Sequence, residues 1–183
     1  MRQRGKRTPR PLDADGLWEL ALKALGARAC SVGELRQKLR ARAMNLEDVD
    51  VTLARLKEYR YLDDRRFAEN YAAARLENQR LGKNRVTQEL RRRRVAPSLV
   101  EAAVEKTYGQ TDDVALIEEF IRRKYRGTSP AELFQDDKQL ASAYRRLMRA
   151  GFNSGNAIRA LKRFAAHPEL LDQFEPPPQT SEE

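Results

Sequence analysis

Pairs of carboxylates recur at four places in this chain of 183 residues. The pairs are Asp13 with Asp15, Asp63 with Asp64, Asp112 with Asp113, and Asp136 with Asp137. Two adjacent carboxylates can hold a divalent cation or share the work of a general acid and base. Each pair, however, directly precedes a stretch of helical periodicity, where an acid that caps the helix stabilises it by about 0.5–2 kcal/mol. The pattern therefore favours helix caps over metal or catalytic sites.

Other reactive side chains are too few to form a catalytic set. The chain has one histidine, His167, and one cysteine, Cys30, whereas a usual zinc site needs at least three such ligands. The sequence contains no glycine-rich phosphate loop and no nucleophile elbow. Cys30 precedes a predicted helix cap and is best explained as a small apolar filler. We therefore expect no catalytic residue, metal or cofactor, and a protein that is not an enzyme.

Clustered cations are the sequence feature that points most directly to binding. The formal net charge is +9, and such a field favours polyanions and acidic protein surfaces. The densest run of cations extends from Lys83 to Arg94. Within this run, Val86 and Leu90 are expected to turn one helix face inward. A solvated helix end stabilised by its own dipole is the structural alternative. The residues predicted to bind a partner, from this run and two later clusters, are Lys83, Arg85, Gln88, Arg91, Arg92, Arg93, Arg94, Arg122, Arg123, Lys124, Arg145, Arg146 and Arg149.

Polar residues at the starts of the periodic stretches predict where helices begin. Ser31 and Glu34 form a capping box. Asn45 and Asn153 are predicted to cap two later helices, and Pro97 suits the first turn of another. No segment alternates with period two for long enough to form a good strand. We therefore expect an all-α chain of about nine helices.

One apolar pattern occurs three times, with its anchors at Leu39, Leu90 and Leu147, which lie 51 and 57 residues apart. Each copy has an apolar helix end, an apolar turn residue, a cap position and a further helix with apolar residues four apart. The apolar turn residues are Met44, Val95 and Phe152. A repeat of this length indicates several similar small modules. The predicted fold is an elongated array of three tandem three-helix repeats.

The predicted boundaries follow the composition and the turn signals. The expected segments are a disordered basic arm at 1–12, repeats at 13–62, 63–109 and 110–166, and a disordered tail at 167–183. In the second repeat, Phe67, Tyr71 and Ala74 form the predicted inward stripe of the first helix. No apolar run approaches the roughly 20 residues of a membrane span. The basic N-terminus has no apolar segment behind it. We expect a cytoplasmic monomer with no membrane partner.

In several ordered blocks between about residues 17 and 165 the chain resembles the RecX family, the regulators of RecA recombinase. Residues 61–67 resemble its Tyr-Leu-Asp-Asp-x-x-Phe signature, and residues 82–90 resemble its Gly-x-x-Arg-Ile-x-Gln-Glu-Leu segment. Arg60 stands where the family usually has a small residue or glycine, and Ala96 stands where it has a serine-like cap. The signature positions, expected to be mainly structural, are Tyr61, Leu62, Asp63, Asp64, Phe67, Tyr125, Gly151 and Phe152.

The resemblance implies a modulator of RecA, most often a negative regulator, acting in DNA recombination, repair and the SOS response. It implies binding in the groove of the RecA–single-stranded DNA filament, and limitation of strand exchange, ATP hydrolysis and coprotease activity. The alternative is a general nucleic-acid-binding protein that affects recombination indirectly, with single- or double-stranded DNA as its partner. The affinity of such a protein would fall steeply with salt and would not require RecA.

Overall fold

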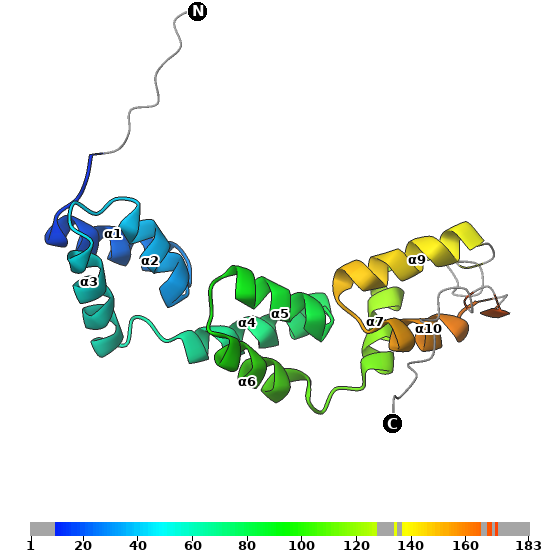
Figure 1. Ribbon diagram of the computed structural model, residues 1–183. Coiled ribbons are helices and arrows are strands. Elements are labelled where there is room, and N and C mark those ends of the chain that lie inside the picture. Colours follow the sequence, from blue (N-terminus) through cyan, green and yellow to red (C-terminus); the bar gives the residue numbers. More distant parts are fainter. Residues whose placement is uncertain (1–9, 128–133, 135–136, 166–167, 170, 172–183) are drawn as a thin grey trace, which may run out of the picture. The chain divides into compact units, whose positions relative to one another are not determined.

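The structure, a computed structural model, describes residues 10–127, 134, 137–165, 168–169 and 171. These residues form nine α-helices and no β-strand, which confirms the all-α prediction. The helices in chain order (Figure 1) are α1 (Ala14–Ala27), α2 (Val32–Arg40), α3 (Glu47–Glu58), α4 (Asp64–Gln79), α5 (Lys83–Arg92), α6 (Pro97–Tyr108), α7 (Asp113–Lys124), α9 (Asp137–Ala150) and α10 (Ser154–Lys162).

Contacts along the chain divide it into two compact units. The first unit consists of Met1–Ala68 and Leu90–Val100, and the second consists of Glu69–Glu89 and Glu101–Glu183. The boundary passes through α4, α5 and α6. The first unit therefore holds α1, α2 and α3, and the second holds α7, α9 and α10, each with parts of the three middle helices.

The core of the first unit is built by α1, α2 and α3, which contact one another. Its buried members are Leu17, Ala21, Ala24, Leu35, Leu39, Val49, Leu53, Leu56 and Leu62. Their spacing of three and four residues gives each helix one inward stripe. Each fully buried leucine or valine stabilises the fold by about 1.5–3 kcal/mol. This core confirms the predicted inward position of the repeat anchor Leu39.

Side-chain caps fix the starts of several helices. The carboxylates of Asp13, Asp63 and Asp112 each accept hydrogen bonds from backbone amides in the first turns of α1, α4 and α7. Ser31 and Glu34 form the predicted capping box of α2. These contacts confirm capping at three of the four acidic pairs. The fourth pair, at residues 136–137, lies outside the side chains that the structure describes, as does the only histidine, at residue 167.

The start of α3 differs from the prediction. The helix begins at Glu47, and Leu46 occupies the cap position without a side-chain hydrogen bond. Asn45 still accepts a hydrogen bond from the Glu47 amide, at 3.1 Å, from one residue outside the cap. Asn45 is therefore a turn residue before the helix rather than its cap, because the helix starts one residue later than the pattern indicates.

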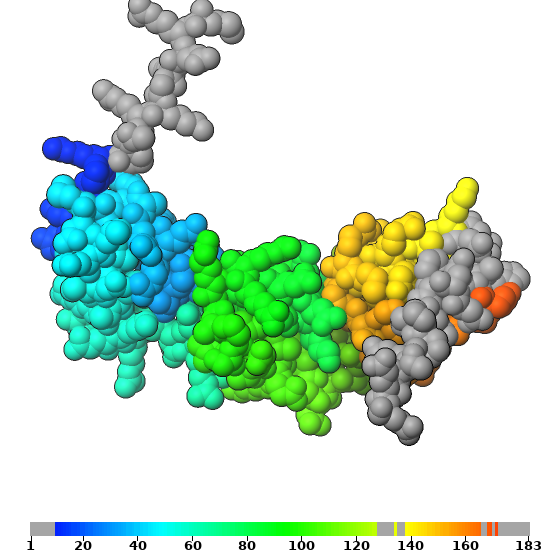
Figure 2. All heavy atoms as spheres, in the orientation of Figure 1, coloured from blue at the N-terminus to red at the C-terminus, as the bar shows by residue number. Residues whose placement is uncertain are grey.

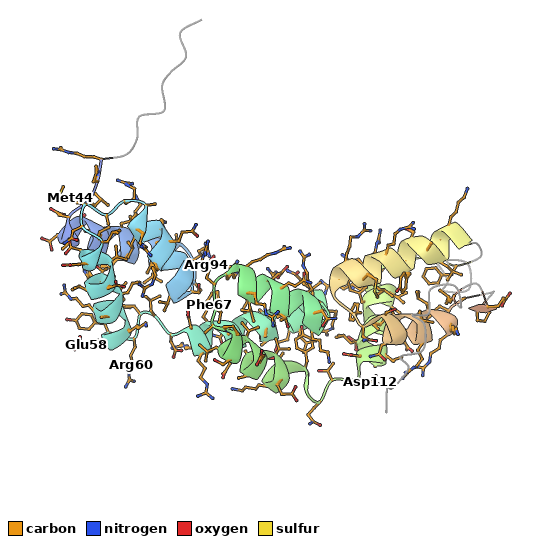
Figure 3. All side chains as sticks on the ribbon, viewed as in Figure 1. Met44, Glu58, Arg60, Phe67, Arg94 and Asp112 are labelled. Atoms are coloured by element: carbon orange, nitrogen blue, oxygen red, sulfur yellow. The ribbon has the colours of Figure 1, made fainter. Side chains whose placement is uncertain are left out.

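Residues 10–12 belong to the first unit rather than to an arm, which corrects the predicted boundary. Leu12 donates to the Arg42 carbonyl at 2.7 Å and accepts from the Met44 amide at 2.8 Å. Its side chain packs against the core, as does Ala43. This pairing explains why Met44 (Figure 3) is 71% exposed, whereas the matching turn residues of the other two copies are buried. The rest of the predicted arm, residues 1–9, lies outside the described residues.

The inward stripe of α4 is offset by one residue from the prediction. Ala68 and Ala72 are fully buried. Phe67 and Tyr71 are half-buried, and Ala74 is exposed. The prediction followed the largest side chains, but α4 turns its small residues inward, where alanine permits close helix approach.

Many of the buried residues of the second unit lie on α7, α9 and α10. On α7, Val114, Ile117 and Ile121 are buried and form its inward stripe. The rings of Phe120 and Phe152 pack edge-on, with their centres 5.5 Å apart. Leu171 is fully buried, although the tail was expected to be disordered from residue 167. An apolar residue beyond the last long helix therefore contributes to the fold.

Glycines allow a helix start to lie directly against a turn in both units. A Cβ on Gly33 would lie 2.4 Å from the Cβ of Arg94, in the turn after α5. A Cβ on Gly82 would lie 2.3 Å from the carbonyl oxygen of Gly151, in the turn after α9. Both turn residues have left-handed backbones, with φ of 60° and 89°. Each follows its repeat anchor by four residues, so the same close contact occurs twice in the chain.

Candidate binding site for an anionic partner

An open pocket of about 550 Å³ lies in the second unit, where α4, α7 and α9 end. Its lining residues are Asn78, Gln79, Leu81, Phe120, Arg123, Lys124, Arg146, Arg149 and Ala150. Four of these nine residues are cations, and none is an acid. The structure thus brings together four of the predicted binding residues, which come from two separate clusters in the sequence.

The cores of α7 and α9 determine where these cations point. On α7, buried Ile117 and Ile121 leave the last turn, with Arg123 and Lys124, facing solvent. Figure 2 shows one side of α9 (yellow to orange) open to solvent on the face displayed. A cation near a helix C-terminus gains about 0.3–1 kcal/mol from the helix dipole. The helix dipole accounts for each cation on its own helix. It does not account for cations from two helices that line one pocket without an acid.

Neutral groups, rather than carboxylates, hold the pocket cations. The Arg123 guanidinium donates to the Asn78 carbonyl at 2.6 Å. The Lys124 ammonium lies 5.8 Å from the centre of the Phe120 ring, and the Arg146 guanidinium packs on a tyrosine ring. Within the part of the chain that the structure describes, no carboxylate pairs with Lys124, Arg146 or Arg149. The pocket therefore carries uncompensated positive charge that an anionic group would neutralise.

A second pocket, of about 330 Å³, adjoins the first because both are lined by Arg123. Its other lining residues are Arg80, Glu119, Arg122 and Arg126. Arg80 pairs with Glu119 at 2.8 Å, and Arg122 pairs with a glutamate one turn earlier on α7. Sequence reasoning placed Arg122 among the binding residues but missed Arg80, which follows α4. This second pocket is partly neutralised and offers less free charge than the first.

The remaining predicted residue of the third cluster lies outside both pockets. Arg145 is exposed on α9 next to Arg146, but it does not line the pocket.

On α5, Lys83, Gln88 and Arg91 are exposed. Arg92 is exposed as well. These residues match the prediction of an outward basic helix face, without the convergence that α7 and α9 provide.

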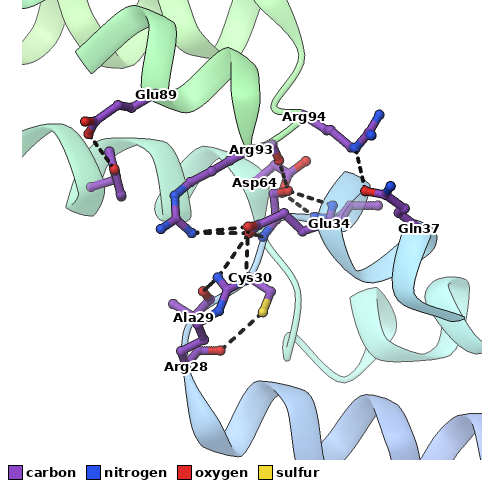
Figure 4. Close-up of polar contacts among 12 residues, drawn as sticks. Arg28, Ala29, Cys30, Glu34, Gln37, Asp64, Glu89, Arg93 and Arg94 are labelled. Carbon is purple, nitrogen blue, oxygen red and sulfur yellow. Dashed lines mark hydrogen bonds and ion pairs between the residues drawn. The ribbon is translucent and has the colours of Figure 1, made fainter. Parts of the chain in front are cut away.

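Arg93 and Arg94, in contrast, face the first unit's own helices (Figure 4). Arg93 pairs with Glu34 at 3.3 Å, and its carbonyl accepts a hydrogen bond from the Ser31 hydroxyl. Arg94 donates to the Gln37 side chain at 3.0 Å. The sequence predicted outward charge at these two positions. The chain turns left-handed at Arg94, which directs both side chains back toward α2.

Glu89 organises a half-buried network in the second unit. The Tyr71 hydroxyl donates to Glu89 at 2.7 Å, Arg85 donates at 2.8 Å, and Arg75 lies at 3.0 Å. Burial alone would raise the pKa of Glu89, but the hydrogen bonds from Tyr71 and Arg85 and the two positive charges outweigh it. The pKa of Glu89 is therefore lower than usual, and Arg85 is largely committed to this network.

The lowered pKa values of Glu89 and Glu34 predict a loss of stability in acid. Burial opposes the shift at Glu34, but bonds from Arg28 and the Ser31 amide lower its pKa. A depressed folded-state pKa gives stability that is complete above the ordinary carboxyl value and is lost as the pH falls through the folded value. We expect the melting temperature to fall between about pH 5 and pH 3. In a thermal melt series, Glu89→Gln should flatten this dependence; an unchanged slope would contradict the assignment.

Most residues of the family signature have structural contacts. Leu62 and Phe152 are buried. Asp64 accepts a hydrogen bond from the Val32 amide at 2.8 Å, and burial raises the pKa of this carboxyl. Tyr61 differs, because 59% of it is exposed. The signature therefore includes a large aromatic side chain that the fold leaves exposed.

The described part of the chain offers neither a membrane-spanning helix nor a metal site. No helix there is long and apolar enough to cross a membrane. No group of three or more histidine, cysteine, aspartate or glutamate side chains in the same part is placed to hold a metal ion. Cys30 is half-buried, with its thiol 3.4 Å from the Arg28 carbonyl.

The chain is similar to known proteins over nearly its whole length. Family models for the first and second three-helix domains of RecX match residues 18–56 and 63–104. The regulatory protein RecX of Trichlorobacter lovleyi is 32% identical over 141 residues, covering 77% of this chain and 90% of the relative. The regulatory protein RecX of Deinococcus radiodurans is 33% identical over 188 residues, covering 98% of this chain and 82% of the relative.

A solved structure agrees in fold. The crystal structure of RecX from Lactobacillus salivarius superposes with a TM-score of 0.60 at 15% identity, over 82% of this chain and 96% of that one. The matched three-helix domains and the relatives at more than 30% identity lead to one conclusion: this chain belongs to the RecX family of regulatory proteins.

Proposed function

We propose that this protein is a negative regulator of RecA that binds the RecA–single-stranded DNA filament and limits its ATPase, strand-exchange and coprotease activities. The observation that carries the proposal is the basic pocket formed by Lys124, Arg146 and Arg149 with Arg123, together with membership of a family of regulatory proteins. Uncompensated cations on a rigid helical surface suit an acidic protein face or the phosphates of a filament.

Within this proposal the pocket is the main contact, and the exposed face of α5 is the second. Charge that is fixed on helices gives a partner a defined geometry, whereas charge on a freely moving segment does not. Arg93 and Arg94 act mainly within the first unit, since their side chains contact Glu34 and Gln37. The best remaining candidates on α5 are Lys83, Arg91 and Arg92, whose side chains are exposed.

General nucleic-acid binding is the competing proposal, and the net charge of +9 supports it. The two proposals differ in their dependence on RecA and on salt. A general DNA binder displaces counterions, so its affinity falls steeply with salt and does not require RecA. The amount of a filament regulator that is needed for inhibition follows the concentration of RecA subunits, not the concentration of free DNA.

The test is the DNA-dependent ATPase of the cognate RecA, titrated with this protein at constant DNA. We expect inhibition to reach its maximum when this protein is far too scarce to cover the DNA. We also expect the inhibition to persist when excess competitor DNA is added. Inhibition that disappears in proportion to competitor DNA would instead indicate simple DNA sequestration. No effect at any ratio, or stimulation, would contradict negative regulation.

A further inference from the structure

All three non-glycine residues with a left-handed backbone, within the part of the chain that is described, are arginines: Arg60, Arg80 and Arg94, with φ of 58°, 54° and 60°. Each follows a helix at the position where glycine is preferred, because a side chain is strained there. The backbone at Arg60 is held by the cap of α3, because the Arg60 amide donates to the Lys57 carbonyl and the Tyr61 amide donates to the Leu56 carbonyl, both at 2.9 Å.

The side chains of two of the three arginines have partners inside the protein. Arg80 pairs with Glu119 at 2.8 Å and donates to the carbonyl of Glu77 at 2.6 Å. Arg94 donates to Gln37 at 3.0 Å. The side chain of Arg60 makes no hydrogen bond or ion pair with any described residue. Figure 3 shows it in the loop after α3, directed away from the ribbon. Its cation is therefore not committed to a described partner.

Arg60 instead lines a pocket of about 650 Å³ in the first unit. Its cationic lining residues are Lys57, Arg60, Arg65 and Arg66, and its apolar ones are Val32, Leu62 and Leu99. The lining also holds two acids, Asp63 and Asp64, which accept hydrogen bonds from backbone amides. The four cations outnumber these two acids, so the lining keeps a net positive charge.

Exposed aromatic rings flank Arg60 on both sides in the sequence. Tyr59 is 54% exposed and Tyr61 is 59% exposed, and their ring centres are 6.3 Å apart. Trp18 packs edge-on against Tyr59 at 6.0 Å, with the Arg55 guanidinium 4.3 Å from the indole ring. Cations beside exposed, supported rings are the combination that holds single-stranded nucleic acid, where phosphates meet the cations and unpaired bases stack. An acidic protein segment would use the cations but leave the rings exposed.

We propose that the pocket around Arg60, with the flanking rings of Tyr59 and Tyr61, binds single-stranded nucleic acid. This site lies in the first unit and is separate from the basic pocket of the second. It goes beyond regulation of RecA, because it requires no RecA. Arg60 supplies the cation at the centre of this site.

The test is fluorescence anisotropy of a labelled oligothymidine of roughly 20 nucleotides, with the full chain and no RecA. Arg60→Gly should weaken binding about 3- to 10-fold and should reduce the slope of log affinity against log salt by about 0.7. The same variant should melt at an equal or slightly higher temperature, because glycine relieves the left-handed backbone. Affinity and stability then move in opposite directions, which a purely structural role would not produce.

Arg94→Gly is the matched control, since it removes the same charge from the same type of backbone position. It should change the affinity less than about 2-fold. Equal losses for the two variants would overturn the proposal, because net charge alone would then explain binding. An unchanged affinity in Arg60→Gly would also overturn it.

Tyr61 separates stacking from charge. Tyr61→Ala should weaken binding to the single strand roughly 5-fold or more and leave a duplex of equal length unaffected, whereas Tyr61→Phe should retain affinity. Equal losses on both DNA forms would contradict base stacking. Displacement of the oligonucleotide by polyglutamate as effectively as by unlabelled DNA would assign the pocket to an acidic protein instead. Because RecA is absent, these outcomes leave the regulatory proposal untouched.

Discussion

Replacing Gly82 with alanine is expected to lower the free energy of unfolding by about 2–3 kcal/mol, because the new Cβ would enter occupied space. It would lie 2.3 Å from the Gly151 carbonyl oxygen and 2.6 Å from the Phe152 amide nitrogen. Both are backbone atoms, which cannot rotate away as a flexible side chain would. The clash would also break the hydrogen bond from the Gly82 amide to the Ala150 carbonyl, now 2.9 Å long.

Gly151→Ala should cost more, about 3 kcal/mol or higher, because two penalties combine. Its φ of 89° is strained for any L-residue, and its Cβ would lie 2.2 Å from the Arg85 backbone nitrogen. Chemical denaturation followed by circular dichroism measures both effects. The control is Gly26→Ala, since nothing lies within 4 Å of a Cβ there. That change lies within α1 and should stabilise the helix by up to about 1 kcal/mol. Equal changes in the free energy of unfolding for the three alanine variants would refute the close contact between Gly82 and Gly151.

The second large effect is expected from reversing the charge of the basic pocket. Changing Lys124, Arg146 and Arg149 to glutamate removes three favourable contacts, each worth about 1–3 kcal/mol against a charged partner, and adds repulsion. We expect affinity for the RecA–single-stranded DNA filament to fall at least about 100-fold. All three side chains are exposed and lie outside the apolar core, so the fold should persist. Arg123 is left unchanged because it caps the Asn78 carbonyl.

The matched control reverses three exposed cations outside the pocket, at Lys23, Lys38 and Arg40. The net charge changes by the same amount in the two triple variants. If pocket geometry directs binding, the control should lose less than about 10-fold. Equal losses would favour general polyanion affinity. Melting curves of both variants should coincide with that of the unmodified protein, which excludes unfolding as the cause of weak binding.

Local features of the fold could be predicted from sequence because their causes lie within a few residues. The capping box at Ser31 and Glu34, the caps at Asp112 and Asn153, and the stripe on α7 all depend on one helix and its flanking turn. The repeat anchors were also predictable, since Leu39 and its two counterparts are fully or almost fully buried. Apolar periodicity and capping chemistry are sufficient for such features.

Several of the failed predictions share a cause, which is contact between residues far apart in the sequence. Leu12 and Met44 differ from expectation because a β-bridge joins the segment before α1 to the turn after α2. Arg93 was expected to face solvent but pairs with Glu34, 59 residues earlier. Leu171 lies in a stretch whose composition indicates disorder, yet the core of the second unit buries it. No local pattern encodes these partners.

The candidate site could be predicted only in its parts. Runs of cations identify the last turns of α7 and α9, and these runs contain Arg123, Lys124, Arg146 and Arg149. Their convergence with the end of α4 could not be inferred, because it depends on how three helices separated by some 70 residues pack. The pocket around Arg60 was missed for another reason: the sequence singles out Arg60 itself but not the distant residues that line the pocket with it, such as Val32 and Leu99.

The most direct test of the regulatory account is the DNA-dependent ATPase of RecA, titrated in parallel with the unmodified protein, the pocket triple variant and the control triple variant. We predict that the unmodified protein and the control inhibit the ATPase at similar concentrations, while the pocket variant requires at least about 100-fold more. Inhibition by the pocket variant at the same concentration as the unmodified protein would contradict the assignment of the pocket as the main contact with RecA.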